Sequence, residues 1–325
     1  MPIRISALIC THNRARYLRK ALQSLVAQTM DSDSYEILVI DNASTDETKR
    51  VVKEEYAAVS NLAYLHEPVL GLARARNTGW AHARGEYVAY LDDDAIACAN
   101  WLEGILEVFE SVTPTPGCVG GKIELIWEAP RPSWLSDGMV LFLSRLDLSE
   151  SPVALKDSQF LAGANIAFPV NVLRATGGFE FGLTGKWRFY NDDILLQRRL
   201  ESRGLSRIYH PDISVGHHIP ASRLSKESFR RRYYWQGISD AFLRQVLSPV
   251  SRRALARDAL HEIRRLGSSL FGNHVSPRRL YWHVREMTLN DWFFSAYLAG
   301  QIRQKVLMTI QYRSREPDNA VLSRH

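Results

Sequence analysis

With 325 residues, of which 46% are hydrophobic and 23% charged, the chain can bury one large core or two modest ones, which excludes a mainly disordered protein. The net charge of +6 is unevenly divided, because residues 221–325 hold 19 Lys and Arg against 8 Asp and Glu, a net +11, which leaves −5 for residues 1–220. Three scattered cysteines, no signal-like start and no apolar run near the about 20 residues of a membrane span exclude a disulfide framework and predict a cytoplasmic protein.

The first part of the chain, to about residue 125, alternates strand and helix patterns in the way an α/β sheet does. Apolar runs predict strands at residues 3–10, 36–41, 62–66 and 87–91. Helices are predicted at residues 16–28 and 73–83, and after the capping-box patterns at 44–47 and 100–103.

The second part of the chain is less regular before it becomes helical. Residues 126–158 show few clear periods and resemble a long functional loop. Beyond them we expect a strand at 160–168, a turn at 177–179, a helix at 192–203 that Gly204 ends, and short strands at 207–210 and 213–218. Past Pro220 the pattern is helical, and we place a domain boundary there.

Three consecutive carboxylates, Asp92, Asp93 and Asp94, follow the strand predicted at 87–91. Like charges repel one another and are costly to bury unpaired, so a cation is expected beside them. Mg²⁺ or Mn²⁺ fits, because these ions take carboxylate, water and phosphate oxygens. Together with the preceding segment 71–79, the triplet predicts a metal and diphosphate site. The alternative is a solvated acidic turn that caps the next helix.

Seven motifs in order resemble glycosyltransferase family 2, whose members use nucleotide-sugar donors and have the GT-A fold. The motifs are Thr11-His12-Asn13-Arg14, residues 39–46, residues 75–79, Asp92-Asp93-Asp94, Gly177-Gly178-Phe179, Asn191-Asp192-Asp193 and His217-His218. The resemblance covers about residues 3–220 and implies an α/β fold with a Rossmann-like mixed central sheet and flanking helices. It also implies a catalytic domain at 1–220, with the nucleotide sugar bound by about 1–125 and the acceptor by about 126–220, followed by a basic helical region at 221–325.

The resemblance assigns the donor to residues near the amino terminus. It implies that Thr11, Asn13, Arg14 and Asp41 hold the nucleoside, with uridine favoured, and a carboxylate can accept a base N–H. It places Arg76 near the diphosphate, where a guanidinium can pair with phosphate oxygens through two donors. The alternatives are a surface ion pair for Arg76 and a turn-forming role for Asn13.

For the metal, the resemblance matches Asp92-Asp93-Asp94 to the family's Asp-x-Asp motif. It implies that Asp94 contacts the ion, while Asp92 and Asp93 reach the ribose or metal-bound water. A histidine near the end of the catalytic domain often completes the coordination, and His217 or His218 occupies that place. Packed or solvated histidines are the alternative.

Sugar transfer also needs a general base for the acceptor hydroxyl. The resemblance matches Asp192-Asp193 to the family's acid pair at a helix start, where the helix dipole helps to keep a carboxylate ionised. We expect Asp193 to be the base and Asp192 to orient it or the acceptor, while helix stabilisation alone is the alternative. The preceding aromatic residues Trp187 and Tyr190 would stack on acceptor sugars, or simply pack.

The basic region holds an amphipathic pattern at residues 251–270. Its apolar stripe includes Leu255, Ala259, Ile263 and Leu266, and five arginines surround it. One hypothesis is peripheral attachment to an anionic membrane on its cytoplasmic face. The alternatives are packing on the same chain and a homodimer through these helices. Nucleic acid is not expected as a partner, because no binding motif accompanies the arginines.

Together these patterns predict an inverting, metal-dependent glycosyltransferase. It would move a sugar from a nucleoside diphosphate to a glycan or lipid-linked acceptor in the synthesis of polysaccharide or cell-surface glycan. Two alternatives are a catalytically silent relative that acts as a membrane or partner-binding scaffold, and a sugar nucleotidyltransferase. The nucleotidyltransferase would favour a glycine-rich, lysine-containing phosphate loop near the first strand, which the sequence lacks.

Overall fold

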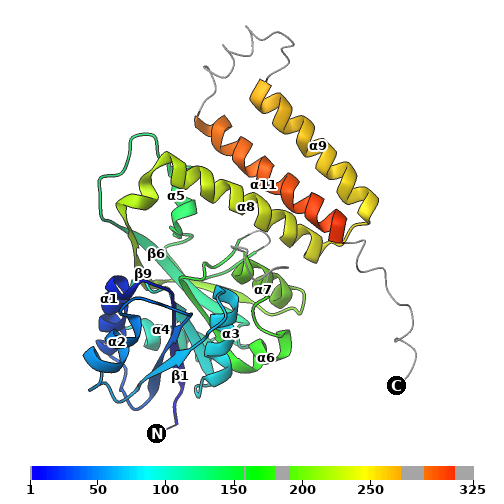
Figure 1. Cartoon of the computed structure of the whole chain (residues 1–325). Helices are drawn as coiled ribbons and strands as arrows, with labels where there is room; N and C mark the ends of the chain where they lie inside the picture. The colour runs from blue at the N-terminus through cyan, green and yellow to red at the C-terminus, as the bar shows by residue number, and fades with distance from the viewer. Residues whose placement is uncertain (1, 157–158, 181–190, 272–288, 312–325) are drawn as a thin grey trace. The chain divides into compact units, whose positions relative to one another are not determined.

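The computed structural model describes residues 2–156, 159–180, 191–271 and 289–311. The chain divides into two units, Met1–Trp187 with Asp192–Ala221, and Arg188–Asn191 with Ser222–His325. The first unit contains a mixed β-sheet flanked by helices, and the second contains long helices (Figure 1).

Strands of the first unit hydrogen-bond in the order β3-β2-β1-β4-β8-β6-β9-β5, and β7 adds to β9. In chain order they are β1 (Ile5–Thr11), β2 (Tyr35–Asp41), β3 (Leu62–His66), β4 (Tyr87–Leu91), β5 (Ala95–Ala97), β6 (Cys118–Trp127), β7 (Val153–Ala154), β8 (Asn165–Pro169) and β9 (Arg207–Ile219). The first four strands run parallel, β8 is antiparallel to β4 and β6, β9 is parallel to β6, and β5 is antiparallel to β9.

Helices cover both faces of this sheet, with α1 and α2 on one side and α3 on the other (Figure 1). They are α1 (Ala15–Val26), α2 (Thr48–Arg50), the π-helical turn η1 (Val51–Glu55), α3 (Leu72–His82), α4 (Trp101–Ser111), α5 (Asp137–Val140), the 3-10 turn η2 (Leu141–Leu143), α6 (Val170–Thr176) and α7 (Asp192–Glu201). Strands β1, β2 and β4 are buried along almost their whole length, as their apolar runs predict. Helix α1 buries Leu18, Leu22 and Leu25 in the same hydrophobic core.

The register of the sheet brings several strand ends to one edge. Thr11 lies opposite Asp41, and Leu8 lies opposite Tyr90, so β1, β2 and β4 end near one another. A turn formed by the acidic triplet joins β4 to β5, whose pairing with β9 places Ala95 opposite His217. The topology therefore brings the turns after β1, β2 and β4 close to the end of β9.

Several predicted elements agree with the structure, while others differ for identifiable reasons. The strands at 62–66 and 87–91 have the predicted bounds. The capping box predicted at 44–47 is wrong, because the Ser44 hydroxyl accepts from the backbone N–H of Asn13 and the helix starts only at Thr48. Asp46 accepts from the Thr48 backbone N–H instead, at 3.0 Å.

The prediction of a mostly irregular segment at 126–158 is wrong in part. Strand β6 extends to Trp127, and α5, η2 and β7 lie within the segment. The strand predicted at 160–168 begins only at Asn165. The two short strands predicted at 207–210 and 213–218 are one long strand, β9, whose register with β6 shifts at a bulge between Gly121 and Ile123.

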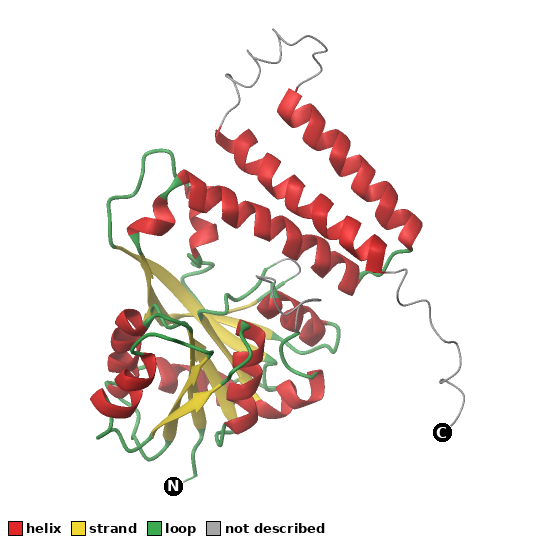
Figure 2. Ribbon diagram, viewed as in Figure 1, coloured by secondary structure: helices red, strands yellow, loops and turns green. Residues whose placement is uncertain are grey.

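Within its described residues the second unit contains three long helices, and a 3-10 turn precedes them in the chain. They are η3 (Ala221–Leu224), α8 (Lys226–Leu247), α9 (Arg252–Phe271) and α11 (Leu289–Gln311). Helix α11 packs against both α8 and α9, and the three lie side by side (Figure 2). Added Cβ atoms at Gly237 and Gly300 would clash with the carbonyl oxygens of Tyr297 and Tyr234, so these glycines let α8 and α11 approach closely. Among the described helices, none combines the length and apolarity that crossing a bilayer requires.

Polar groups also join the helices of this unit. The Tyr297 hydroxyl donates to Asp240 Oδ2 at 2.9 Å, and Lys305 Nζ lies 3.5 Å from Glu262 Oε1 with both side chains buried. The predicted stripe of α9 is only partly buried, since Leu255 and Ala259 are buried but Ile263 is 46% exposed. Leu260 is also exposed on this helix.

Candidate active site

Two carboxylates and an imidazole converge at the edge where β4 ends. Ligand atoms of Asp92, Asp94 and His217 all lie within 4.8 Å of one another. The two aspartates occupy the turn between β4 and β5, and His217 reaches them from β9 because Ala95 pairs with it. Asp94 and His217 are both buried. Two carboxylates and one imidazole are a donor set that suits a divalent cation.

The His217 ring is held by a contact at each of its two nitrogens. Its Nδ1 lies 3.0 Å from the backbone carbonyl oxygen of Leu143, and its Nε2 lies 3.1 Å from Asp94 Oδ1. Because a carbonyl can only accept, Nδ1 donates to Leu143, and this bond turns Nε2 toward the acids. Metal-ligating histidines are commonly held in this way, so the residues present fit a cation.

The acidic triplet has other partners within the protein. Arg14 donates from Nη2 to Asp94 Oδ2 at 2.5 Å, and its Nη1 lies 3.2 Å from Asp93 Oδ1. The Thr11 hydroxyl donates to Asp93 Oδ2 at 2.7 Å, and Arg76 Nη2 lies 3.8 Å from Asp92 Oδ1. Since Asp93 and Asp94 are buried, the alternative of a solvated acidic turn is wrong.

Burial changes the pKa values of these acids. The pKa of Asp93 is raised to about 7, mainly by burial. The charge of Asp94 also raises this pKa, and the charge of Arg14 opposes the rise. Burial also raises the pKa of Asp92, against the opposing charge of Arg76. An added positive charge would favour the ionised form of both groups.

The second acidic group lies at the start of α7. Asp193 accepts the Gly163 backbone N–H through Oδ2 at 2.7 Å and the Ile194 N–H through Oδ1 at 2.8 Å. Burial, reinforced by the charge of Asp192, raises the pKa of Asp193 to about 6, and Arg76 opposes both effects. An added Cβ at Gly163 would meet the Arg76 guanidinium and Asp193 Oδ2, so only glycine fits there without displacement.

Arg76 lies between the two acidic groups. Its Nη1 donates to Asp192 Oδ2 at 2.8 Å, in addition to its 3.8 Å approach to Asp92. Its guanidinium carbon lies 5.1 Å from the centre of the Phe179 ring. The side chain is 5% exposed, so the alternative of a surface ion pair is wrong.

Several hydrogen bonds within the protein hold the turns that are assigned to the nucleoside. Asp41 is buried, and it accepts from the Tyr64 hydroxyl through Oδ2 at 2.6 Å and from the Ser44 N–H through Oδ1 at 2.9 Å. Asn13 Oδ1 accepts from the backbone N–H groups of Thr45 and Asp46 at 2.7 and 3.2 Å. Asn13 therefore performs the turn-forming role considered for it, and Asp41 is fixed in place by its neighbours.

Two of the residues assigned to the acceptor, Trp187 and Tyr190, lie outside the described residues. Sequence reasoning also missed contacts made by Tyr64, Gly163 and the Leu143 carbonyl. An isolated glycine within the apolar run 160–168 was a usable signal for a close approach. No sequence pattern marks the Leu143 carbonyl, because every residue carries one.

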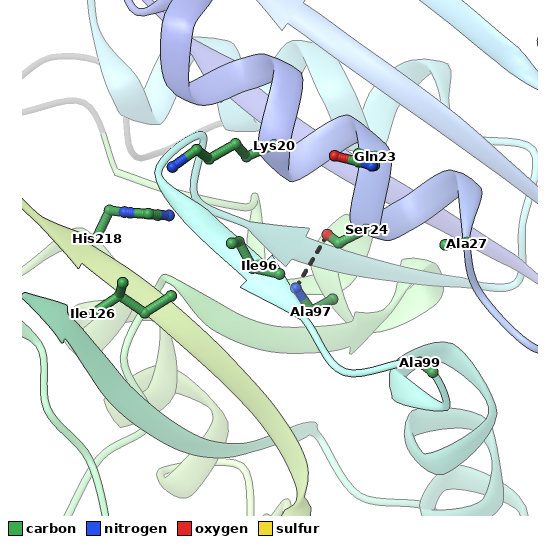
Figure 3. Close-up of a pocket in the computed structure, with 9 residues that line it drawn as sticks. All are labelled: Lys20, Gln23, Ser24, Ala27, Ile96, Ala97, Ala99, Ile126 and His218. Carbon is green, nitrogen blue, oxygen red and sulfur yellow. Dashed lines mark hydrogen bonds between the residues drawn. The ribbon is translucent and has the colours of Figure 1, made fainter.

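His218 points to the other face of the sheet, as strand alternation requires. It lines a hollow of about 480 Å³ together with Lys20, Gln23 and Ser24 of α1, Ile96 of β5 and Ile126 of β6 (Figure 3). His218 Nδ1 lies 3.2 Å from Glu128 Oε1. Of the two histidines considered for the metal, His217 is therefore the one beside the acids.

Comparison with known proteins identifies the family. The family model described as glycosyl transferase family 2 matches residues 6–174. The glycosyltransferase AglE of Haloferax volcanii is 33% identical over 229 residues, which cover 70% of this chain and 71% of that protein. The glucosyl-dolichyl phosphate glucuronosyltransferase of the same organism is 24% identical over 243 residues, which cover 73% of this chain and 76% of that protein.

A solved structure shares the fold. The mannosyltransferase PcManGT from Pyrobaculum calidifontis, in complex with GDP-Man and Mn²⁺, superposes with a TM-score of 0.55 at 18% identity. The match covers 98% of this chain and 83% of that chain. The expected GT-A architecture is thereby confirmed. The family model and the curated relatives confirm the expectation of a glycosyltransferase. The chain belongs to glycosyltransferase family 2.

Proposed function

We propose that this glycosyltransferase moves a sugar from a nucleoside diphosphate to a glycan or lipid-linked acceptor, with a divalent cation and with inversion at the anomeric carbon. The observation that carries this proposal is the convergence of Asp92, Asp94 and His217 within 4.8 Å. The mannosyltransferase of the same fold was solved with GDP-Man and Mn²⁺, which supports this choice of donor and cation.

Asp94 and His217 would hold the cation, Mn²⁺ or Mg²⁺, and Asp92 would contact it or a water bound to it. When bound, such an ion stabilises the negative charge that develops on a departing diphosphate. His217 is already oriented for this role by the Leu143 carbonyl.

Donor binding is assigned to the turns after β1 and β2. A carboxylate offers about four acceptor positions, so Asp41 keeps capacity for a base N–H beyond its bonds to Tyr64 and Ser44. Thr11 and Asn13 would shape the nucleoside site, through Asp93 and through the turn at Thr45. Arg14 and Arg76 would supply positive charge near the diphosphate.

Asp193 would be the general base. It would take the proton of the acceptor hydroxyl as the oxygen forms a bond to the anomeric carbon and the bond to the diphosphate breaks. One displacement of this kind inverts the configuration. Arg76 pairs with Asp192, so Asp192 would orient the acid pair, and Trp187 and Tyr190 would contribute to the acceptor side.

The domain roles follow the same division. Residues 1–220 would form the catalytic domain, with the nucleotide sugar held by about 1–125 and the acceptor by about 126–220. Helices of the region 221–325 would attach the protein to an anionic membrane surface or pair it with a second copy. Exposed Leu260 and Ile263 on α9, among exposed Arg253, Arg257 and Arg264, favour the membrane.

An activity assay tests the proposal. Purified protein is incubated with uridine and guanosine diphosphate sugars, with Mn²⁺, with Mg²⁺ or with a chelator, and released nucleoside diphosphate is measured. We expect release to require the cation and to fall by about 10² to 10⁴ in Asp193→Asn, the range of a lost general base. Glu107→Gln, an exposed acid on α4, is the matched control. The proposal would be rejected if neither the chelator nor Asp193→Asn changed the release of nucleoside diphosphate.

A further inference from the structure

The positive charge beside the acidic triplet is supplied by the guanidinium of Arg14. It lies in the turn between β1 and α1, and its guanidinium bonds Asp94 Oδ2 at 2.5 Å and approaches Asp93 Oδ1 to 3.2 Å. Asp94 thus has the Arg14 guanidinium at one oxygen and the His217 ring at the other. A divalent cation bound by Asp94 and His217 would compete with the guanidinium for the same carboxylate.

The charges around the triplet favour such a competition. Arg76 forms ion pairs with Asp92 and Asp192, whereas Arg14 forms ion pairs with Asp93 and Asp94. A doubly charged ion held by Asp94 and His217 would share this carboxylate with the guanidinium, and two cations at one carboxylate repel each other. Binding of the ion would therefore weaken the ion pair between Arg14 and Asp94.

Arg14 is the arginine that is able to move. Its side chain is 35% exposed, whereas that of Arg76 is 5% exposed. Its guanidinium carbon already lies 5.0 Å from the centre of the Tyr17 ring, which gives it a second contact that does not involve the acids. Its main chain lies in a turn between β1 and α1, so no strand or helix pairing is broken when the side chain swings.

We propose that Arg14 is an exchangeable counter-ion: it neutralises Asp93 and Asp94 until a divalent cation and a nucleoside diphosphate arrive, and then pairs with the phosphates. This inference rests on the cation site of the proposed function. With the cation alone, Arg14 would lose its acidic partners, and this loss would weaken binding of the cation. A diphosphate supplies such a partner, so cation and diphosphate strengthen each other's binding by the same factor.

Direct titration of Mn²⁺ tests the inference without an activity assay. Free Mn²⁺ is measured by electron paramagnetic resonance in the presence of the full chain, alone and then with uridine or guanosine diphosphate. We expect Arg14→Gln to bind Mn²⁺ alone about tenfold more tightly than the unaltered protein, since one charged hydrogen-bond competitor is gone. The enhancement of Mn²⁺ binding by the diphosphate should shrink in the variant.

Two further variants make the comparison specific. Arg16→Gln removes an arginine two residues away that is 74% exposed and lies 3.8 Å from Glu128, and it should leave Mn²⁺ binding unchanged. Arg14→Lys keeps the charge and loses the two-donor fork, so its Mn²⁺ affinity should lie between those of the unaltered protein and Arg14→Gln. Thermal unfolding of each variant checks that the fold is retained.

The outcomes separate this inference from the proposed function. Arg14→Gln with unchanged or weaker Mn²⁺ binding would overturn the exchange, provided that Asp94→Asn still abolishes binding. If Asp94→Asn binds Mn²⁺ as the unaltered protein does, or if neither protein binds it with a diphosphate present, the cation site and the inference fail together.

Discussion

At the scale of single residues, arginines neutralise two groups of acids, most of which are buried. Arg14 pairs with Asp93 and Asp94, and Arg76 lies between Asp92 and Asp192. Buried carboxylates without such partners would be costly, and removing an arginine would leave an uncompensated charge. Asp193 is held differently, since its oxygens accept from the backbone N–H groups of Gly163 and Ile194.

The raised pKa of Asp193 predicts how activity depends on pH. Burial raises this pKa to about 6, and a general base works only in its ionised form. The maximal rate should therefore be constant well above pH 6 and fall about tenfold per unit of pH below it. The rate is measured at saturating donor and cation, because Asp93, whose pKa is raised to about 7, would change binding over the same range.

Two results would contradict this pH prediction. One is a maximal rate that does not change from about pH 5 to about pH 8, where the ionised fraction of such a base changes most. The other is a rate that rises as the solution becomes more acidic, because that would require the protonated form of the group. Asp193→Glu supplies a check, since a shifted carboxylate should move the acid limb along the pH axis.

At the scale of the elements, one buried side chain joins four of them. Asn165 begins β8, and its Nδ2 donates to the carbonyl oxygens of Ile213 in β9 and Lys122 in β6 at 2.8 and 3.1 Å. Its Oδ1 accepts from Trp101 Nε1 in α4 at 2.9 Å. These bonds satisfy buried polar groups of β6, β9 and α4 at the start of β8.

Asn165→Leu should therefore destabilise the protein strongly. It leaves two carbonyl oxygens and an indole N–H without this partner, and each buried unsatisfied group costs about 1–3 kcal/mol. We expect the free energy of unfolding in urea to fall by about 3 kcal/mol or more. Asn100→Leu is the control, since Asn100 is exposed at the start of α4 and its side chain makes no capping bond. Equal loss in both variants would contradict the role of Asn165.

Sequence patterns predicted the elements with uneven success. The strands at 62–66 and 87–91 are apolar runs with clear ends, and their bounds were found without error. Strand β6 was missed because Gly120 and Gly121 interrupt its pattern. Added Cβ atoms there would clash with the carbonyl oxygens of Asn165 and Ile213, so close packing required residues that weaken the strand signal. Similarly, Pro211 and Asp212 divided the pattern of β9, which continues through a bulge.

At the scale of the whole molecule, the resemblance of the ordered motifs predicted the family and the fold. Parallel strands present their terminal turns at one edge of the sheet, which explains why motifs far apart in sequence meet there. The partners of those motif residues were not predictable. Arg14 and Asp94 are 80 positions apart in the sequence, and Arg76 and Asp192 are 116 apart. No local pattern selects such pairs, because they depend on how the turns and β9 meet in space.

The uneven charge of the chain makes membrane attachment testable as a property of the full protein. Residues 221–325 carry +11 and residues 1–220 carry −5, and α9 exposes Leu260 and Ile263 among its arginines. We expect the protein to float with vesicles that contain phosphatidylserine and not with phosphatidylcholine alone, because the attraction is to anionic lipid. Flotation should weaken as salt rises from about 0.1 M to about 1 M, over which the screening length falls about threefold.

Double substitution of Leu260 and Ile263 by glutamine separates a membrane surface from a homodimer. The change leaves the charge intact and removes the exposed apolar groups, so flotation should fall at every salt concentration. Val26→Gln, an exposed apolar position at the end of α1, is the matched control and should float normally. If the double variant floats as before but changes from dimer to monomer in sedimentation, these residues form a contact between copies, and the membrane proposal is wrong.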